Sequence, residues 1–256
     1  MPGDDLFYRV YDDLFADKDY AGEVRSALAL GGIGAPERCH VLEIGAGTGN
    51  HSIACARLGC AVTALEIDAR MIEVMGAKLA TLESPLRSRI RLFAGPLEAL
   101  EPGSFDLAIA LFNVVNHLAD LEALASLFAS VQRNLRRGAS FVFDAWNGVA
   151  ALRDPPRDKT SRVETPSHVL DISLESRTDP MRSETRLLYT IESREKQGPG
   201  RETGRYTLRH SFWPPRVLTD LLEQSGFELR GVFALGEPMR LATAEDWKLL
   251  FHCRRP

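Results

Sequence analysis

Apolar residues recur along the chain with two periods, and the change from one period to the other divides the sequence. Near the start, the spacing of Leu6, Val10 and Leu14 predicts one face of a helix. From residue 40 onward, short apolar runs alternate with helical segments; the runs cover 40–45, 61–67, 90–95, 105–111 and 139–146. Near-continuous apolar strands separated by helices, one of them predicted over 121–138, are typical of a parallel sheet covered on both faces.

The pattern changes after residue 150. Between 160 and 213, three stretches alternate apolar and polar residues, which predicts an antiparallel β-meander. A helix with prolines at its start and two further strands close the chain, so the predicted sheet has seven strands. We therefore expect an α/β fold with a doubly wound, mostly parallel sheet. Its parts are an N-terminal helical cap (1–34), a core (35–149 and 214–256) and an inserted antiparallel sheet (150–213).

Composition narrows the class of protein. Of the 256 residues, 45% are hydrophobic and 26% charged, and the formal net charge is −4. An acidic chain without a basic aromatic platform is a poor match for nucleic acid. No apolar run reaches the roughly 18 residues of a membrane span, and the acidic first ten residues lack the apolar segment of a signal peptide. The four cysteines form no CxxC pair, so we expect a cytoplasmic protein without a metal site.

The segment HVLEIGAGTGNHS (40–52) places Gly45, Gly47 and Gly49 directly after the first predicted strand. Glycines let a ligand approach the backbone closely, and doubly wound sheets bind ligands where the strand order reverses. Glu66 ends the second strand, where an acid accepts hydrogen bonds from both hydroxyls of a ribose. These residues predict a site for a nucleotide-like ligand.

Two features argue against a dinucleotide. The glycine spacing is G-x-G-x-G, whereas the pyrophosphate fingerprint is G-x-G-x-x-G. Glu43 precedes the first glycine by two residues; its carboxylate would repel a diphosphate and attract an ammonium or a sulfonium. In the alternative interpretation, Glu43 only orients the loop by accepting hydrogen bonds from it.

Four segments resemble, in order, the motif series of the class I S-adenosylmethionine-dependent methyltransferases: VLEIGAGTGNHS, VTALEIDARMI, FDLAIALFNVVNHL and LRRGASFVFDAWN. The resemblance covers residues 39–147 and extends to the terminal strands. The segment YDDLFADKDYAGEV resembles the cap of small-molecule members, including sugar N-methyltransferases, which also carry an antiparallel sheet inserted late in the chain. The resemblance implies S-adenosyl-L-methionine as cofactor.

The resemblance also assigns cofactor-binding residues. The loop with Glu43, Gly45, Ala46, Gly47 and Gly49 is expected to hold the methionine part, and Glu66 the ribose. The remaining assignments are Ile67 and Leu97 near the adenine, Leu111 and Phe112 beside the methionine tail, and Tyr11 and Tyr20 closing over the cofactor. Family members often have an acid after the third strand, but this chain has Pro96 there.

His117 follows the fourth strand and is the candidate catalytic residue, because an imidazole suits proton exchange near neutral pH. The alternative is that it caps a helix or packs beneath the cap. Asn113 and Asn116 either orient the acceptor or shape the turn, and Trp146 is a candidate wall of the acceptor pocket. His210 shares an apolar face with Tyr206 and Phe212, which favours packing or bonding between sheets.

The sequence therefore predicts methyl transfer to a nitrogen or oxygen of a small-molecule acceptor, and the cap resemblance favours an amino sugar or a specialised-metabolism intermediate. A non-catalytic cofactor-binding protein is the main alternative. An NAD-dependent oxidoreductase is a further alternative, but the glycine spacing of this chain differs from the dinucleotide fingerprint. The long meander edge also suggests a homodimer.

Overall fold

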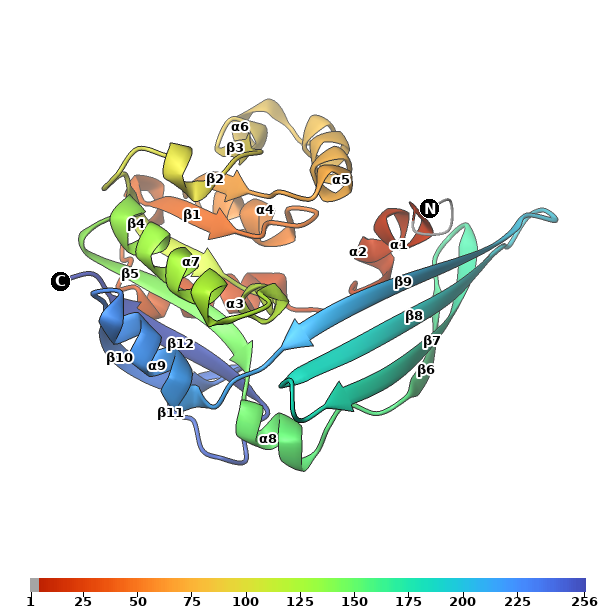
Figure 1. The fold of residues 1–256 in the computed structure, drawn as a ribbon. Coiled ribbons are helices and arrows are strands. Elements are labelled where there is room, and N and C mark those ends of the chain that lie inside the picture. The colour runs from red at the N-terminus through yellow and green to blue at the C-terminus, as the bar shows by residue number, and fades with distance from the viewer. Residues whose placement is uncertain (1–4) are drawn as a thin grey trace.

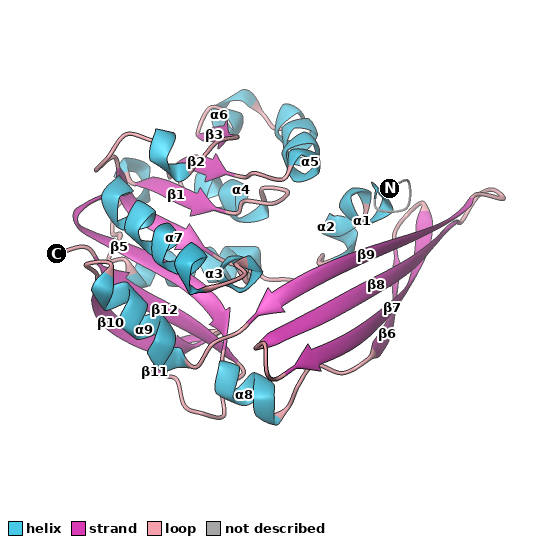
Figure 2. Ribbon diagram, viewed as in Figure 1, coloured by secondary structure: helices cyan, strands magenta, loops and turns pink. Residues whose placement is uncertain are grey.

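The computed structural model describes residues 5–256 and contains two sheets (Figures 1 and 2). In the described residues, the larger sheet has eight strands in the order β11-β10-β12-β5-β4-β1-β2-β3. Their bounds are β1 His40–Ile44, β2 Ala61–Leu65, β3 Ile90–Phe93, β4 Phe105–Ala110, β5 Leu135–Trp146, β10 Glu228–Ala234, β11 Glu237–Leu241 and β12 Lys248–Arg254. Strands β1 to β5 pair in parallel, and β12 runs antiparallel between β5 and β10.

Helices cover both faces of this sheet, as the apolar runs predict (Figure 1). One buried cluster packs α3 (Tyr20–Leu30), α4 (Asn50–Arg57) and α5 (Ala69–Ala80) against one face. The other cluster packs α7 (Leu121–Asn134) and α9 (Pro215–Gln224) against the opposite face. Strand β5 contributes to both, since Phe141 and Phe143 point to one side and Val142 to the other. The short α6 (Ser84–Arg87) precedes β3.

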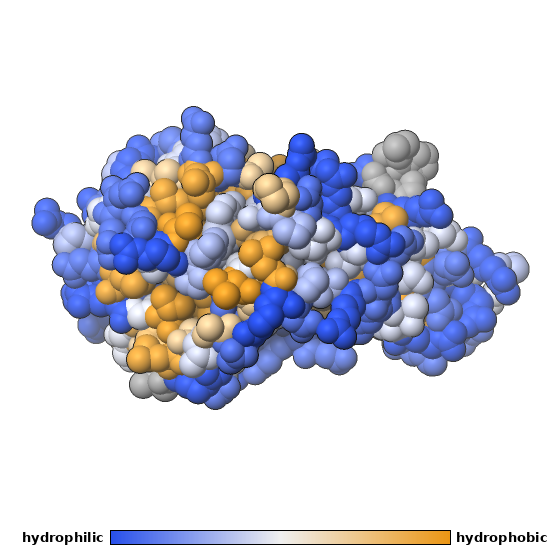
Figure 3. All heavy atoms as spheres, turned by 60° about the horizontal axis from the view of Figure 1, so that its bottom comes forward, coloured by the Kyte–Doolittle hydropathy of each residue, from blue (hydrophilic) through white to orange (hydrophobic). Residues whose placement is uncertain are grey.

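The inserted sheet has four antiparallel strands among the described residues: β6 Lys159–Glu164, β7 His168–Asp179, β8 Glu184–Glu195 and β9 Arg201–Ser211. Helix α8 (Gly148–Arg153) leads into it from β5. It extends from the core as a long arm (Figure 2), and its surface is mainly polar, whereas apolar side chains gather over the core (Figure 3).

The N-terminal helices α1 (Asp5–Arg9) and α2 (Tyr11–Leu14) pack on the arm. Leu6 and Phe7 form a buried cluster with Leu170, Ile172 and Ile191 of the arm. The ring of Phe7 stacks on Tyr206 with 3.9 Å between centroids. The cap is thus fixed to the inserted sheet by apolar contacts, and both lie over the carboxyl ends of the core strands. Within residues 5–256, no helix is long and apolar enough to cross a membrane.

Three details differ from the sequence predictions. The helix predicted over 121–138 ends at Asn134, because the carbonyls of Arg133 and Asn134 accept the N–H groups of Gly103 and Ser104. Strand β6 was missed because its residues are mostly exposed and carry no apolar alternation. The sheet has an eighth strand, β11, which lies at the edge and contains a proline, a residue that is uncommon inside strands.

Candidate functional site

A cavity of about 630 Å³ opens at the carboxyl ends of the parallel strands, beside the ends of the neighbouring strands β1 and β4. Cavities of this volume suit a cofactor or a drug-sized ligand. Its wall combines segments from the cap, the core and the arm. The predicted site residues on it are Tyr11, Tyr20, Gly45, Ala46, Gly47, Glu66, Ile67, Leu97, Leu111, Phe112, Asn113, His117 and Trp146. The structure therefore brings most of the predicted site together.

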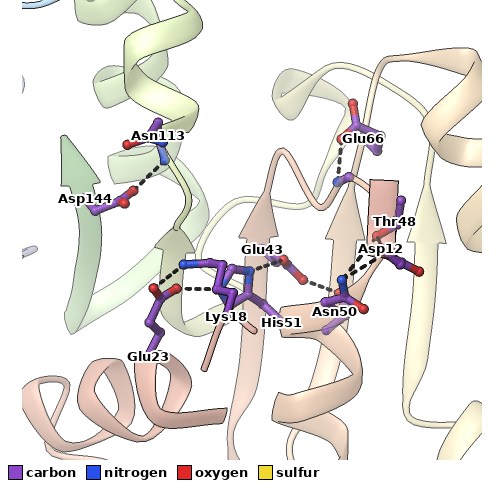
Figure 4. Close-up of polar contacts among 12 residues, drawn as sticks. Asp12, Lys18, Glu23, Glu43, Thr48, Asn50, His51, Glu66, Asn113 and Asp144 are labelled. Atoms are coloured by element: carbon purple, nitrogen blue, oxygen red, sulfur yellow. Dashed lines mark hydrogen bonds and ion pairs between the residues drawn. The ribbon is translucent and has the colours of Figure 1, made fainter. Parts of the chain in front are cut away.

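The carboxylate of Glu66 fixes the shape of the glycine loop. Its Oε2 accepts the N–H of Gly47 at 2.6 Å, and its Oε1 accepts those of Ile67 at 2.7 Å and Asp68 at 2.9 Å. These bonds join the loop after β1 to the end of β2 (Figure 4). A carboxylate has about four lone-pair sites, so Glu66 keeps acceptor capacity for a ligand hydroxyl.

The three glycines of the loop serve different purposes, although all have positive φ. A Cβ on Gly45 would lie 2.8 Å from Val114, and one on Gly49 would lie 2.8 Å from Met75. The branched Val114 side chain leaves no room for a Cβ at position 45, whereas at position 49 the flexible Met75 can shift and the positive φ of 84° is what favours glycine. A Cβ on Gly47 would meet nothing within 4 Å among the described residues, because this residue faces the cavity. The space beside Gly47 is where a ligand can approach the backbone.

The substitution Gly47→Ala is expected to weaken binding of S-adenosylhomocysteine by about tenfold or more, because the added methyl group occupies ligand space. The positive φ of 55° adds a destabilisation of about 1 kcal/mol. Gly103→Ala is the matched control, since Gly103 has a φ of 67° and equally open surroundings but does not line the cavity. Titration calorimetry and thermal melting distinguish the two effects. Equal affinities for the two variants would contradict the assignment.

Glu43 lies behind the glycine loop and is absent from the cavity wall. Its side chain is 2% exposed, accepts a hydrogen bond from the Ser52 hydroxyl, and lies 3.7 Å from Nδ1 of His51. Burial raises its pKa to about 8. The carboxyl group is thus largely protonated near neutral pH. The contacts of Glu43 are with Ser52 and His51 of α4 and not with amides of the glycine loop. Its role toward a sulfonium stays a prediction.

A chain of polar contacts joins this buried carboxyl to the cap (Figure 4). His51 Nε2 lies 2.8 Å from Glu23 of α3, and Glu23 pairs with Lys18. Burial opposes ionisation of Glu23, but the contacts with His51 and Lys18 outweigh it and lower the pKa. Burial lowers the pKa of His51. This series of contacts couples the position of the cap segment to α4 and the glycine loop.

A second link between cap and loop runs through Asp12 of α2. Its Oδ1 accepts hydrogen bonds from Thr48 at 2.6 Å and Asn50 at 3.0 Å, and its carboxylate pairs with Lys78. The sequence interpretation did not include Asp12, Lys18 or His51 in the site. Charged residues in a polar segment are typical of a solvent-exposed surface, and the sequence does not indicate which loop they contact in the fold.

The pH dependence of stability is expected to change in a Glu43→Gln variant. The folded protein holds this proton up to about pH 8, whereas the unfolded chain releases it near 4.5. Folding therefore binds a proton between these values, and wild-type stability falls as pH rises, by at most about 1.4 kcal/mol per pH unit from this group. The glutamine variant lacks this contribution. Urea unfolding from pH 5 to 8.5 should show the variant gaining stability relative to wild type as pH rises.

Burial raises the pKa of Asp144 to about 6, so this residue also lowers stability as pH rises, and it does so equally in wild type and in Glu43→Gln. Only the difference between variant and wild type therefore reports on Glu43. A constant difference in unfolding free energy over this pH range would show that Glu43 is ionised in the folded protein.

The loops after β2 and β3 form an apolar end of the cavity. Ile67 is 79% exposed although it is a large apolar residue, and it lies on the cavity wall with Leu97. Pro96 begins the turn that leads into Leu97, and the Leu97 carbonyl accepts the side-chain amide of Asn134 at 3.1 Å. The exposed face of Ile67 is suited to a flat aromatic ring.

The turn after β4 is strained. Phe112 and Asn113 both have positive φ, at 72° and 66°, which is uncommon for residues other than glycine. The Asn113 N–H donates to buried Asp144 at 2.8 Å and holds this conformation. Such strain persists where surrounding contacts fix it, and it concentrates at functional sites. The turn presents Leu111, Phe112 and Asn113 to the cavity.

The short helical turn Val114–His117 presents His117 to the cavity, and burial lowers the pKa of its ring. The neighbouring Asn116 is 0% exposed and is absent from the cavity wall. Its Nδ2 donates to the Ser211 carbonyl at 2.8 Å, and its Oδ1 accepts a hydrogen bond from the backbone N–H of Trp146 at 3.1 Å. Asn116 thus bridges β5 and β9, which explains its burial without a substrate contact.

Residues of the arm that the sequence did not assign to the site complete the cavity wall. They are Leu187, Tyr189, Tyr206, Leu208 and His210, and Lys248 of β12 lies with them. Tyr189 and Tyr206 are cross-strand partners in β8 and β9. Their common face is visible as alternation in the sequence, but the sequence does not reveal that this face meets the core. Within the described residues, no group of three or more His, Cys, Asp or Glu side chains is arranged to hold a metal ion.

Residues 41–138 match the family model of a methyltransferase domain. A ubiquinone biosynthesis O-methyltransferase of Xanthomonas campestris pv. campestris is 34% identical over 112 residues, which are 43% of this chain. The chain thus spans less than half of that relative, 44% of its length.

Two solved structures are similar over nearly the whole chain. The CcbJ methyltransferase of Streptomyces caelestis aligns with a TM-score of 0.73 and 21% identity, covering 93% of this chain and 89% of that one. CalS10 of Micromonospora echinaspora, an amino pentose methyltransferase solved with S-adenosylmethionine, aligns with a TM-score of 0.72 and 18% identity, covering 98% and 97%. The chain therefore shares the fold of these methyltransferases, and residues 41–138 are similar to a methyltransferase domain.

Proposed function

We propose that the protein transfers a methyl group from S-adenosyl-L-methionine to a nitrogen or oxygen of a small-molecule acceptor. The observation that carries the proposal is the cavity beside Gly47, at the strand-order reversal, with Glu66 holding the loop in place. The methyltransferase-domain match over the same residues supports it.

The residues of the cavity fit this cofactor at both ends. Glu66 keeps about one of its four lone-pair sites for a ribose hydroxyl, and Ile67 offers an exposed apolar face for adenine. The buried Tyr20 hydroxyl has no hydrogen-bond partner in the part of the chain that the structure describes, so it is available to the polar methionine end. Gly45, Ala46 and Gly47 leave the backbone accessible between these ends. Pro96 stands where related proteins often have an acid, and Leu97 beside it lines the cavity near the expected adenine.

The cofactor supplies a methyl group activated on a sulfonium, so the chain has to align the acceptor and exclude water. Phe7, Tyr11 and Phe15 of the cap supply apolar cover over the cavity. Asn113 is held by Asp144 and shapes the turn beside the reacting region. His117 is the group that takes or positions a proton of the acceptor, and its lowered pKa keeps the imidazole near pH 7 in the neutral form, which can accept a proton.

The acceptor class follows from the remaining wall. Trp146 and the arm residues enclose a mainly apolar space too small and too closed for a nucleic acid duplex. The relatives include an O-methyltransferase and an amino pentose methyltransferase, so both atom types are covered by the proposal. The resemblance of the cap favours an amino sugar or another specialised-metabolism intermediate.

The proposal is tested by turnover with S-adenosylmethionine carrying a trideuterated methyl group. Hydroxyaryl compounds and amino sugars serve as acceptors, and mass spectrometry detects the labelled product together with S-adenosylhomocysteine. A labelled product on either acceptor class supports the proposal. Cofactor binding without any product would instead favour a non-catalytic cofactor-binding protein.

A further inference from the structure

The ring of His210 in β9 is buried in the cavity wall without a protein partner. Its side chain is 5% exposed, and neither Nδ1 nor Nε2 has a hydrogen-bond partner within residues 5–256. The sequence favoured packing or bonding between the sheets for this residue, and the structure shows no such bond among those residues. A buried polar atom without a partner costs about 1–3 kcal/mol, so an apolar side chain would be more stable there. The arrangement indicates that a ligand completes the bonds.

Further unpaired polar groups gather around this ring. The ring of Trp146 lies 4.7 Å from that of His210 in an edge-to-face arrangement, and its buried Nε1 also lacks a partner in the described chain. The ring of His117 lies 4.7 Å from His210 on another side. Lys248, the cross-strand neighbour of Trp146, lines the same cavity. Three elements (β5, β9 and β12) therefore direct polar groups to one part of the wall.

The balance of donors and acceptors defines the chemical group that fits. Trp146 Nε1 and Lys248 only donate hydrogen bonds, whereas a neutral histidine has one donor and one acceptor nitrogen. Burial, together with the neighbouring His117 and Lys248, lowers the pKa of His210 to about 3, so the ring stays neutral. A hydroxyl group, with two lone pairs and one proton, can accept from Trp146 Nε1 and Lys248 and donate to the acceptor nitrogen of His210. An ammonium group offers only donors and would face the charge of Lys248.

Carboxylates that could favour an ammonium lie elsewhere on the wall. Glu66, Asp68 and Glu98 belong to the loops after β2 and β3, at the end assigned to the nucleoside. Asp144 is buried against the Asn113 N–H and does not line the cavity. The region around His210 is therefore suited to a neutral oxygen group.

We infer that His210, Trp146 and Lys248 form an anchor for a hydroxyl group of the acceptor beside His117. This inference rests on the proposed function and narrows its substrate class to hydroxyl-bearing compounds. The anchor hydroxyl fixes the orientation in which the acceptor meets His117. A methylated amino group would have to lie elsewhere on the same molecule.

The test measures binding of two hydroxyl-bearing probes, catechol and 3-amino-3-deoxyglucose, to the protein saturated with S-adenosylhomocysteine. His210→Phe keeps an aromatic ring and removes both nitrogens; Trp146→Phe removes the indole N–H. At least one probe is expected to bind wild type saturably, with a Kd about tenfold higher in His210→Phe, the effect of one lost hydrogen bond of ordinary strength. Trp146→Phe is expected to weaken the same probe.

The control is His168→Phe, because His168 begins β7, pairs with Glu195, and does not line the cavity. Thermal melting and the Kd for S-adenosylhomocysteine check that each variant is folded; His210→Gln replaces His210→Phe should the latter fail to fold. Unchanged probe affinity in the His210 variant, or no binding of either probe to wild type, would overturn the anchor. Failure of S-adenosylhomocysteine itself to bind would instead overturn the proposed function, since the probes can also be titrated alone.

Discussion

A His117→Ala variant is expected to lose about 10²–10⁴-fold in turnover while binding S-adenosylhomocysteine as tightly as wild type. His117 lines the cavity beside Asn113 and Trp146, but the loop that holds the cofactor is formed by other residues. Removing the imidazole takes away a proton acceptor and leaves Glu66 and the glycine loop intact. Steady-state kinetics and calorimetry on the same preparation measure both effects.

The pH profile of turnover distinguishes a proton acceptor from a residue that only packs. The pKa of His117 lies below its usual value of about 6.5 because of burial. The active, neutral form should therefore persist through neutral pH, and turnover should fall only on acidification below that value. Loss of this acidic limb in His117→Asn would support proton transfer. Turnover unchanged in His117→Ala would refute the assignment without affecting the fold.

Glu66→Gln is expected to weaken cofactor binding by about 10²-fold. Three backbone N–H groups converge on the wild-type carboxylate. In glutamine one oxygen becomes an NH₂ group, which cannot accept a hydrogen bond from Gly47 or from Ile67 and Asp68. A charge-assisted hydrogen bond contributes about 1.5–3 kcal/mol, and its loss also releases the glycine loop.

Calorimetry with S-adenosylhomocysteine measures this loss, and Glu73→Gln is the matched control because Glu73 is an exposed residue of α5. Glu66→Asp is the conservative comparison, since it keeps the charge but shortens the reach to Gly47. Near-wild-type affinity in Glu66→Gln would show that the carboxylate neither shapes the loop nor contacts the cofactor.

Most of the core was predictable because the burial of parallel strands on both faces leaves near-continuous apolar runs. The elements that escaped prediction lack that signal. Strand β6 is exposed along most of its length, and β11 lies at an edge and contains a proline. The end of α7 depends on hydrogen bonds from Gly103 and Ser104, which are distant in sequence and leave no local mark.

The site residues also divide into those that the sequence predicts and those that it does not. Glycines and strand-end acids are predictable from their position, and Gly47 and Glu66 line the cavity. Glu43 is two residues from the loop, yet its side chain points to Ser52 and His51 on α4, because successive residues of a strand face opposite sides. His210 and Lys248 come from segments whose meeting depends on how the arm joins the core.

Titration calorimetry of the purified protein with S-adenosylhomocysteine, in parallel with NAD, tests the central claim most directly. The account predicts saturable one-to-one binding of S-adenosylhomocysteine, weakened in Gly47→Ala, and no comparable binding of NAD. Tight binding of NAD with no binding of S-adenosylhomocysteine would contradict it.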